Sequence, residues 1–269
     1  MDILRVLALG DIVGTPGRKA CTEIIPRMRK EEGIDFVIAN AENIAGGSGL
    51  TESAVLDLFD HGVDAVTTGD HAFKKREAED LFRDNNFVLR PANYPEEVPG
   101  VGFNIWENQN GLKIAVINVM GRVFLKTIDC PFKTAKKIVE KVRQQTPLIF
   151  VDFHAEATSE KVAMGWFLDG TVSAVFGTHT HVPTADETIL PQGTGYITDL
   201  GMCGPHLSVI GREVKDALKM FLTQMPIQLR VAEEDPRITG ILLDVDVQTG
   251  KTVNIRRVQE KIIQEVHGN

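Results

Sequence analysis

Short apolar runs separated by polar, glycine-rich stretches recur along the chain. Runs of four to eight apolar residues with this spacing predict buried strands. We expect strands at residues 3–9, 36–40, 64–68, 148–153 and 172–176. Residues 102–119 predict a hairpin, because Asn110 and Gly111 near its centre favour the positive φ angles of a tight turn.

Helix-start and helix-stop residues lie between these strands. We expect one helix after Gly14, with Thr15 as N-cap and Pro16 in its first turn, and others near residues 52–60, 75–83, 132–144, 159–170 and 213–222. Pro26 is expected to kink or end the first helix, and Gly62 to end the second. A short strand within 193–201 and three antiparallel strands at 228–235, 238–247 and 252–262 complete the pattern.

The order of these elements predicts an α/β fold. Because β-α units and antiparallel strands occur in both halves, we expect two mixed sheets packed face to face with helices outside. One doubly wound sheet is the alternative. The length of 269 residues, without a linker, repeat or low-complexity tract, predicts a single domain over residues 1–269.

Composition narrows the class of function. A net charge of -8 argues against binding duplex nucleic acid, which needs Lys and Arg to neutralise the phosphate backbone, and favours a small substrate. Three cysteines without CxxC spacing fit neither a disulfide framework nor a thiolate zinc site. Since no signal peptide is recognisable and no apolar run approaches the ~20 residues that span a membrane, we expect a cytoplasmic protein that makes no membrane contact.

The predicted strands end in side chains that can bind a metal. Taken singly, such residues cap helices or form turns, and a lone histidine is more often structural. Ligands of α/β sheets gather beyond the carboxyl ends of the strands, so five similar strand ends predict one shared site. Carboxylate, amide and imidazole donors without thiolate favour manganese, iron or zinc. The candidate donors are Asp11, Glu42, Asn43, Asp70, His154, His179 and His181.

Five short motifs occur in a fixed order along the chain: GDIVG (10–14), NAENIAGG (40–47), GDHAF (69–73), DFHAEATSEK (152–161) and GTHTHV (177–182). Together with RPANYPE, VINVMGR and ILPQGTGYITDLGMCGP, they resemble the YmdB-like branch of the calcineurin-type metallophosphoesterases. The resemblance covers essentially the whole chain. It implies a four-layer αββα sandwich that hydrolyses cyclic nucleotides, including 2′,3′-cyclic monophosphates.

The resemblance also implies a dinuclear site, with Glu42 bridging two transition-metal ions. One ion is expected among Asp11, Glu42, Asn43 and His181, and the other among Glu42, Asp70, His154 and His179. Iron or manganese is favoured, with zinc as the alternative. Attack by a metal hydroxide would then cleave the diester, with His71 as the general acid. A purely orienting role for His71, next to Asp70, is the alternative.

Two positions depart from the wider superfamily. Val13 stands where the superfamily has the histidine of Asp-x-His, and Asn43 is expected to replace that ligand. Asp70 stands where the family has the asparagine of Gly-Asn-His. The carboxylate keeps an oxygen donor, adds a negative charge and removes an amide donor for phosphate. We therefore expect tighter metal binding and slower turnover.

Two other classes of function compete with hydrolysis. A dinucleotide-binding domain is disfavoured, because GDIVGTPG does not match GxGxxG and Asp11 places an anion where the pyrophosphate would lie. A metal-binding regulator with weak, incidental phosphodiesterase activity needs the same ligands and stays open. The sequence also leaves homo-oligomerisation open. Glu156 and Glu160 are expected to orient loop backbone near His154.

Overall fold

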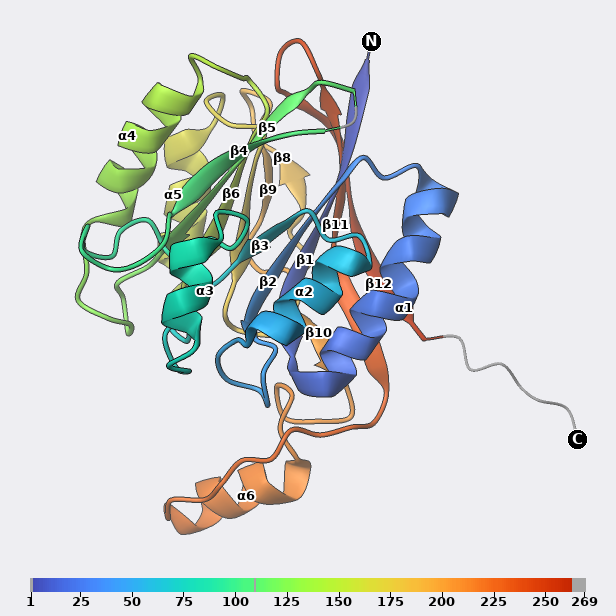
Figure 1. The fold of residues 1–269 in the computed structure, drawn as a ribbon, viewed down its shortest axis with the longest axis vertical. Coiled ribbons are helices and arrows are strands. Elements are labelled where there is room, and N and C mark those ends of the chain that lie inside the picture. The colour runs from blue at the N-terminus through green and yellow to red at the C-terminus, as the bar shows by residue number, and fades with distance from the viewer. Residues whose placement is uncertain (1, 109, 263–269) are drawn as a thin grey trace, which may run out of the picture.

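Two six-stranded mixed sheets form the centre of the protein in a computed structural model, which describes residues 2–108 and 110–262 (Figure 1). The first sheet has the order β12 (Thr252–Lys261), β11 (Pro236–Asp246), β10 (Met202–Pro205), β1 (Ile3–Val13), β2 (Phe36–Asn43) and β3 (Ala65–Thr67). The second has the order β4 (Phe103–Glu107), β5 (Lys113–Met120), β6 (Ile149–His154), β7 (Ala174–Thr178), β9 (Gly195–Ile197) and β8 (Thr188–Ile189).

Helices cover the outer faces of the two sheets (Figure 1). On the first sheet lie α1 (Gly14–Glu32) and α2 (Glu52–Asp60), followed along the chain by α3 (Ala78–Asp84). On the second lie α4 (Pro131–Val142) and α5 (Thr158–Leu168). The last helix, α6 (Val214–Thr223), projects away from this body. The predicted αββα sandwich is confirmed, and the single doubly wound sheet is wrong.

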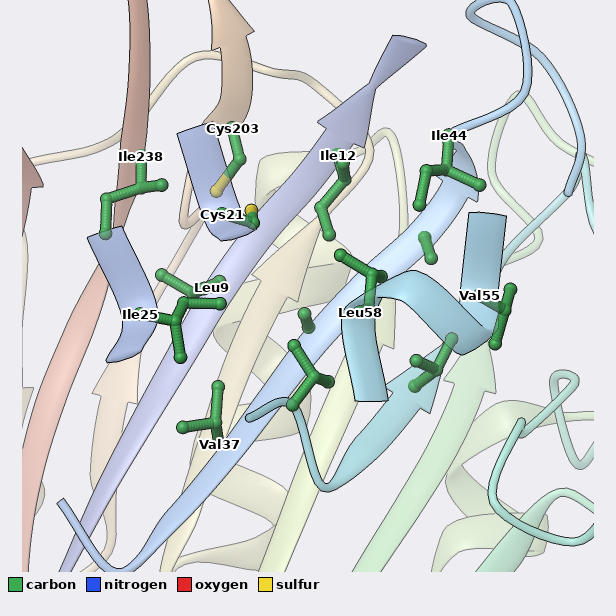
Figure 2. Packing of buried hydrophobic residues seen from close by; sticks show 14 of the residues in the cluster. Leu9, Ile12, Cys21, Ile25, Val37, Ile44, Val55, Leu58, Cys203 and Ile238 are labelled. Atoms are coloured by element: carbon green, nitrogen blue, oxygen red, sulfur yellow. The ribbon is translucent and has the colours of Figure 1, made fainter. Parts of the chain in front are cut away.

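The alternation of side chains along β1 explains why the sheets stack. Leu7 and Leu9 point into the cluster beneath α1 and α2, whereas Val6 and Ala8 point into the cluster between the sheets. Figure 2 shows the outer cluster, where Cys21 and other side chains of the two helices pack on β1 and β2. Both faces of β1 are therefore buried, which is why it reads as an almost continuous apolar run.

The first helix differs from its prediction at its start, and Pro26 does not end it. It begins at Gly14, after Val13, so Thr15 is not the N-cap, because β1 runs on to Val13. Pro26 lies inside the helix, which ends only before Gly33. A proline in a helix costs about 3 kcal/mol. Buried side chains on both sides of it, Ile25 and Met28 among them, each contribute a comparable ~1.5–3 kcal/mol and so keep the helix continuous.

The C-terminal pattern was predicted correctly in two of three strands. The strands at 238–247 and 252–262 are β11 and β12, an antiparallel pair whose turn contains Gly250 at φ 71°. The strand expected at 228–235 is wrong: Val231 makes only an isolated bridge to Arg212. A strand that the sequence did not predict, β10, pairs in parallel with Asp11 and Ile12 instead.

Candidate metal centre

All seven predicted donors lie at the carboxyl ends of strands from both sheets. Asp11 is near the end of β1, and Glu42 and Asn43 end β2. Asp70 follows β3, His154 ends β6, and the two histidines of GTHTH follow β7 directly. The packing of the sheets brings these ends together, as the sequence predicted.

Four of these donors form one compact group. Glu42, Asp70, His154 and His179 each offer one ligand atom, and these atoms all lie within 4.8 Å of one another. Nε2 of His154 lies 3.3 Å from Oδ1 of Asp70 and 3.4 Å from Oε2 of Glu42. Nδ1 of His179 lies 3.0 Å from Nε2 of His154. The group is the same set of four that the sequence predicts for one metal ion.

The remaining three donors adjoin Glu42 through Asn43. Nδ2 of Asn43 lies 3.1 Å from Oε1 of Glu42 and 3.2 Å from Nε2 of His181. Oδ1 of Asp11 lies 3.8 Å from the same His181 nitrogen. Glu42 therefore contacts members of both predicted ligand sets, through Oε1 and through Oε2.

One carboxylate oxygen in this region has no partner among the described residues. Oδ2 of Asp11 accepts the backbone N–H of His179 at 2.9 Å, but Oδ1 is buried and accepts no hydrogen bond. An unsatisfied buried charged oxygen is costly, and a bound cation would satisfy it. The donor set, made of carboxylates and imidazoles without thiolate, fits the transition metals that the sequence predicts.

The electrostatics of the bare residues also fit a cation. Burial, with the charge of Asp199, raises the pKa of Asp11 to about 7, and burial beside Asp11 and Asp70 raises the pKa of Glu42 well above its usual range. Burial lowers the pKa of His154 to about 3, so this imidazole is neutral. Crowded carboxylates and a neutral imidazole are the forms that bind metal ions.

A hydrogen-bonded chain fixes which nitrogen of His154 faces the site. The hydroxyl of Thr178 donates to Oδ1 of Asp152 at 2.7 Å, so its oxygen is free to accept from Nδ1 of His154, 2.9 Å away. The proton then sits on Nδ1, and Nε2 keeps its lone pair toward Glu42 and Asp70. Asn40 donates a further hydrogen bond to Asp152 at 3.2 Å.

These supporting residues were missed from the sequence, although a signal existed. Asp152 precedes His154 by two residues, and Asn40 precedes Glu42 by two. Residues two apart on a strand share a face, so both side chains point toward the side of the sheet that carries the ligand. Burial raises the pKa of Asp152 to about 7, even though Thr67, Thr178 and Asn40 donate hydrogen bonds to it.

The loop with the two histidines has an unusual backbone. His179 has φ 104° and His181 has φ 64°, conformations that non-glycine residues rarely adopt. Between them, the N–H of Thr180 donates to Oδ2 of Asp199 at 3.2 Å, and Nζ of Lys161 contacts the same oxygen at 2.6 Å. This buried ion pair supports the strained loop.

His71 lies at the rim of the donor group. Its backbone N–H donates to Oε2 of Glu42 at 3.0 Å, and its Nδ1 lies 2.7 Å from Oδ1 of Asn43. Nε2 lies 3.5 Å from Oδ2 of Asp70. Partial burial lowers the pKa of His71 below its ordinary value. The ring is part-buried, so it can contact both the donor group and a molecule entering from solvent.

The two loop carboxylates near His154 have different roles. Glu160 accepts the backbone N–H of Arg122 at 3.0 Å, which confirms the prediction that it orients loop backbone. Oε2 of Glu156 instead lies 3.1 Å from Nε2 of His179. The expectation for Glu156 is therefore wrong: its carboxylate contacts the ring of a predicted ligand.

The YmdB-like protein family matches residues 7–258 of the chain. The 2′,3′-cyclic-nucleotide 2′-phosphodiesterase of Bacillus subtilis (strain 168) is 46% identical over 255 residues, which cover 95% of this chain and 96% of that protein. The chain belongs to the YmdB-like family. This confirms the resemblance stated from the sequence motifs.

Solved structures support the same relationship. A hypothetical protein from Thermus thermophilus is 41% identical, with a TM-score of 0.89 over 96% of this chain and 99% of that one. A structure described as a novel phosphatase from Mycoplasma pneumoniae is 33% identical, with a TM-score of 0.90 over 97% of this chain and 94% of that one. The four-layer fold is therefore that of its family.

Proposed function

We propose that this YmdB-like protein is a metal-dependent phosphodiesterase whose substrates are 2′,3′-cyclic nucleotides. The observation that carries the proposal is the group of Glu42, Asp70, His154 and His179, whose ligand atoms lie within 4.8 Å of one another. The similarity to a bacterial 2′,3′-cyclic-nucleotide 2′-phosphodiesterase supports the substrate class. The negative net charge of -8 agrees with a small substrate rather than a long nucleic acid.

Two metal ions are proposed, held by the two donor sets that Glu42 contacts. One ion would be held by Asp11, Asn43 and His181. The other would be held by Asp70, His154 and His179, and Glu42 would contact both ions. Iron or manganese is the preferred metal, and zinc is the alternative. When bound, such ions supply charge for the phosphate oxygens and lower the pKa of a coordinated water. The unpartnered Oδ1 of Asp11 supports its place in the first set.

His71 is proposed as the general acid. Water loses one proton to solvent as its oxygen bonds to phosphorus, the bond from phosphorus to O2′ breaks, and O2′ takes a proton from Nε2 of doubly protonated His71, leaving a nucleoside 3′-monophosphate and a neutral imidazole. Oδ1 of Asn43, 2.7 Å from Nδ1, would hold the ring through its other nitrogen. Such an acid contributes about 10²–10⁴-fold in rate.

The regulatory alternative is not favoured. A metal-binding regulator requires the donor group but not a proton donor. Asn43 and Glu42 hold His71 at the rim of the group, and neither of them binds its Nε2. The relatives are also described as a phosphodiesterase and a phosphatase.

Metal analysis combined with a diester assay tests the proposal. The purified protein, as isolated and after loading with Mn²⁺ or Fe²⁺, would be assayed with 2′,3′-cyclic AMP, and products separated by chromatography. We expect about two metal ions per chain and release of 3′-AMP, both abolished by chelation. Loaded protein that releases no 3′-AMP would overturn the proposed activity.

Two further predictions concern location and assembly. Among the described residues, no helix is long and apolar enough to cross a membrane. A cytoplasmic location is proposed from the sequence.

Homo-oligomerisation is proposed from α6, which exposes Val214, Leu218, Phe221 and Leu222 along one stripe, with Met225 just beyond it. These side chains are 44–82% exposed, and a contiguous exposed apolar face is typical of a protein–protein interface. Light scattering of the native chain and of Leu222→Lys would test it.

A further inference from the structure

The loop of residues 121–126 lies beside the candidate metal centre. It leaves the carboxyl end of β5, where the N–H of Gly121 donates to the carbonyl of His154 at 2.9 Å. At its other end, Nζ of Lys126 donates to the carbonyl of Asp70 at 2.8 Å. Both ends are thus attached to the backbone of residues in the donor group.

Two side chains hold this loop in a defined shape. The carboxylate of Glu160 accepts the N–H of Arg122 at 3.0 Å and that of Val123 at 3.4 Å. Lys126 also donates to the hydroxyl of Tyr94 at 2.8 Å and lies 5.3 Å from the centre of that ring. The loop is exposed but fixed by contacts before and after residue 124.

Phe124, at the tip of the loop, has a strained backbone and an exposed aromatic side chain. Neither feature stabilises the fold. Its φ of 63° is a left-handed conformation that bulky residues rarely adopt. Its side chain is 86% exposed, so the ring contributes almost no burial in return. Backbone strain that is held in place by neighbouring contacts is typical of functional sites.

We infer that Phe124 is the stacking platform for the base of a nucleotide substrate. The inference rests on the proposed function, because it assumes that the phosphate binds at the donor group. In a 2′,3′-cyclic nucleotide the ribose separates phosphate and base, so the base must extend toward the rim of the site. Phe124 lies between Gly121, which is bonded to the carbonyl of His154, and Lys126, which is bonded to the carbonyl of Asp70, so its backbone is held within about 11 Å of Gly121 beside two of the four donors.

The chemistry of the residue sets the specificity. An aromatic face stacks on purines and pyrimidines alike, so the site accepts every base without reading its edge. Such stacking contributes about 1–3 kcal/mol per base, equivalent to roughly 5- to 150-fold in binding. Phe124 therefore acts on the affinity for nucleotides and not on the chemical step.

A matched pair of substrates tests this inference in the full-length, metal-loaded protein. 2′,3′-Cyclic AMP carries a base, whereas glycerol 1,2-cyclic phosphate has the same five-membered cyclic diester without one. Phe124→Ala should raise KM for cyclic AMP about 5- to 100-fold, leave kcat unchanged, and leave kcat/KM for the glycerol diester unchanged. Phe124→Trp should restore the KM for cyclic AMP. Calorimetry should show the same loss of affinity for 3′-AMP.

Phe87→Ala is the matched control, because Phe87 is also an exposed phenylalanine but packs beside Trp106, whose ring contacts Phe36 at the start of β2, the end opposite Glu42. It should leave both substrates unaffected. If Phe124→Ala changes neither substrate, or both equally, the stacking role is overturned while the phosphodiesterase stands. If the unaltered protein hydrolyses neither diester, the proposed function is overturned, and the stacking role with it.

Discussion

Oδ1 of Asn43 lies 2.7 Å from Nδ1 of His71, while Nδ2 of the same amide faces Glu42 and His181. One side-chain amide thus joins the proposed general acid to the predicted ligands of one metal ion. Because the carbonyl oxygen accepts the Nδ1 proton, Nε2 is the nitrogen left for a leaving group, and it donates a proton when the ring is doubly protonated. The amide orientation assigns the proton on Nδ1.

Replacing His71 with alanine should separate catalysis from metal binding. Removal of the proton donor should lower kcat on 2′,3′-cyclic AMP about 10²–10⁴-fold. The predicted ligands remain, so metal content by elemental analysis should not change. His61→Ala is the matched control, since His61 caps the end of α2 by contacting the carbonyl of Asp57. Near-native turnover of His71→Ala would remove the acid role and leave only an orienting one.

Asp70→Asn restores the residue that the family pattern has at this position. Oδ1 of Asp70 lies 3.3 Å from Nε2 of His154 and 3.4 Å from Nδ1 of His179. Although burial opposes it, hydrogen bonding to these histidines lowers the pKa of Asp70, so it carries a full negative charge. The neutral amide should weaken metal affinity about 10-fold and raise turnover.

Metal titration and steady-state kinetics would measure both effects of Asp70→Asn. Asp80→Asn is the control, because Asp80 is an exposed carboxylate on α3 that pairs with Arg83 on the same helix. Equal metal affinity and equal rates for Asp70→Asn and the native chain would show that this charge has no effect on the site.

Glu42→Gln should abolish metal binding without destabilising the metal-free protein. The raised pKa of Glu42 reflects the cost of burying its charge, and the amide avoids that cost. Native protein should gain about 2.7 kcal/mol of stability at a metal concentration of 100 times Kd. The variant should show no metal-dependent rise in Tm, whereas its Tm with chelator should equal or exceed that of the native chain. A metal-dependent rise of native size would contradict a bridging role.

Asp244 gives the stability of the first sheet a predictable pH dependence. Burial alone would raise its pKa, but hydrogen bonds from Arg5, at 2.7 Å, and from Asn254 lower it. A carboxylate whose pKa is lower in the folded state than in the unfolded state stabilises the fold at every pH above its unfolded pKa. This stabilisation is lost as the pH falls from the unfolded pKa to the folded pKa. Asp244→Asn should therefore cost about 1–2 kcal/mol at pH 7, and this cost, measured by urea unfolding, should shrink as pH falls below about 3.9, the pKa of an unfolded Asp. A cost that is independent of pH would exclude the ion pair as its cause.

The sequence predicted the layers and the donor group because both follow from local patterns. An apolar run that ends in Asp11, Glu42 or His154 predicts a strand, and the polar residue that ends it predicts a donor at the carboxyl end of that strand. It did not predict β10, since Met202–Pro205 contains glycine and proline and is a strand only through its pairing with Asp11 and Ile12. Residues 228–235 have an alternating pattern but no neighbouring strand to extend it, beyond the one bridge at Val231.

Long-range contacts also explain what was missed at the site. The strained backbone of His179 and His181 depends on Asp199, which lies in a different segment. No local pattern marks Asp199 or Lys161 as partners, because 38 residues separate them. The loop at Phe124 depends in the same way on Glu160 and Asp70.

Lys161→Met should test how far the buried ion pair supports the metal centre. Both side chains are fully buried, so the variant leaves the Asp199 carboxylate without its counter-charge, which should cost about 3–5 kcal/mol in urea unfolding. The loop between His179 and His181 should loosen, because Thr180 donates to the same oxygen, and metal affinity should fall. Adding Asp199→Asn should recover part of the stability, since the amide oxygen still accepts the N–H of Thr180, whereas its NH2 replaces the oxygen that accepts the N–H of Gly201. Lys136→Met, which breaks only the exposed pair with Glu140 on α4, should cost less than about 0.5 kcal/mol. Equal losses for the two lysine variants would show that the Asp199 pair contributes no more than a surface contact.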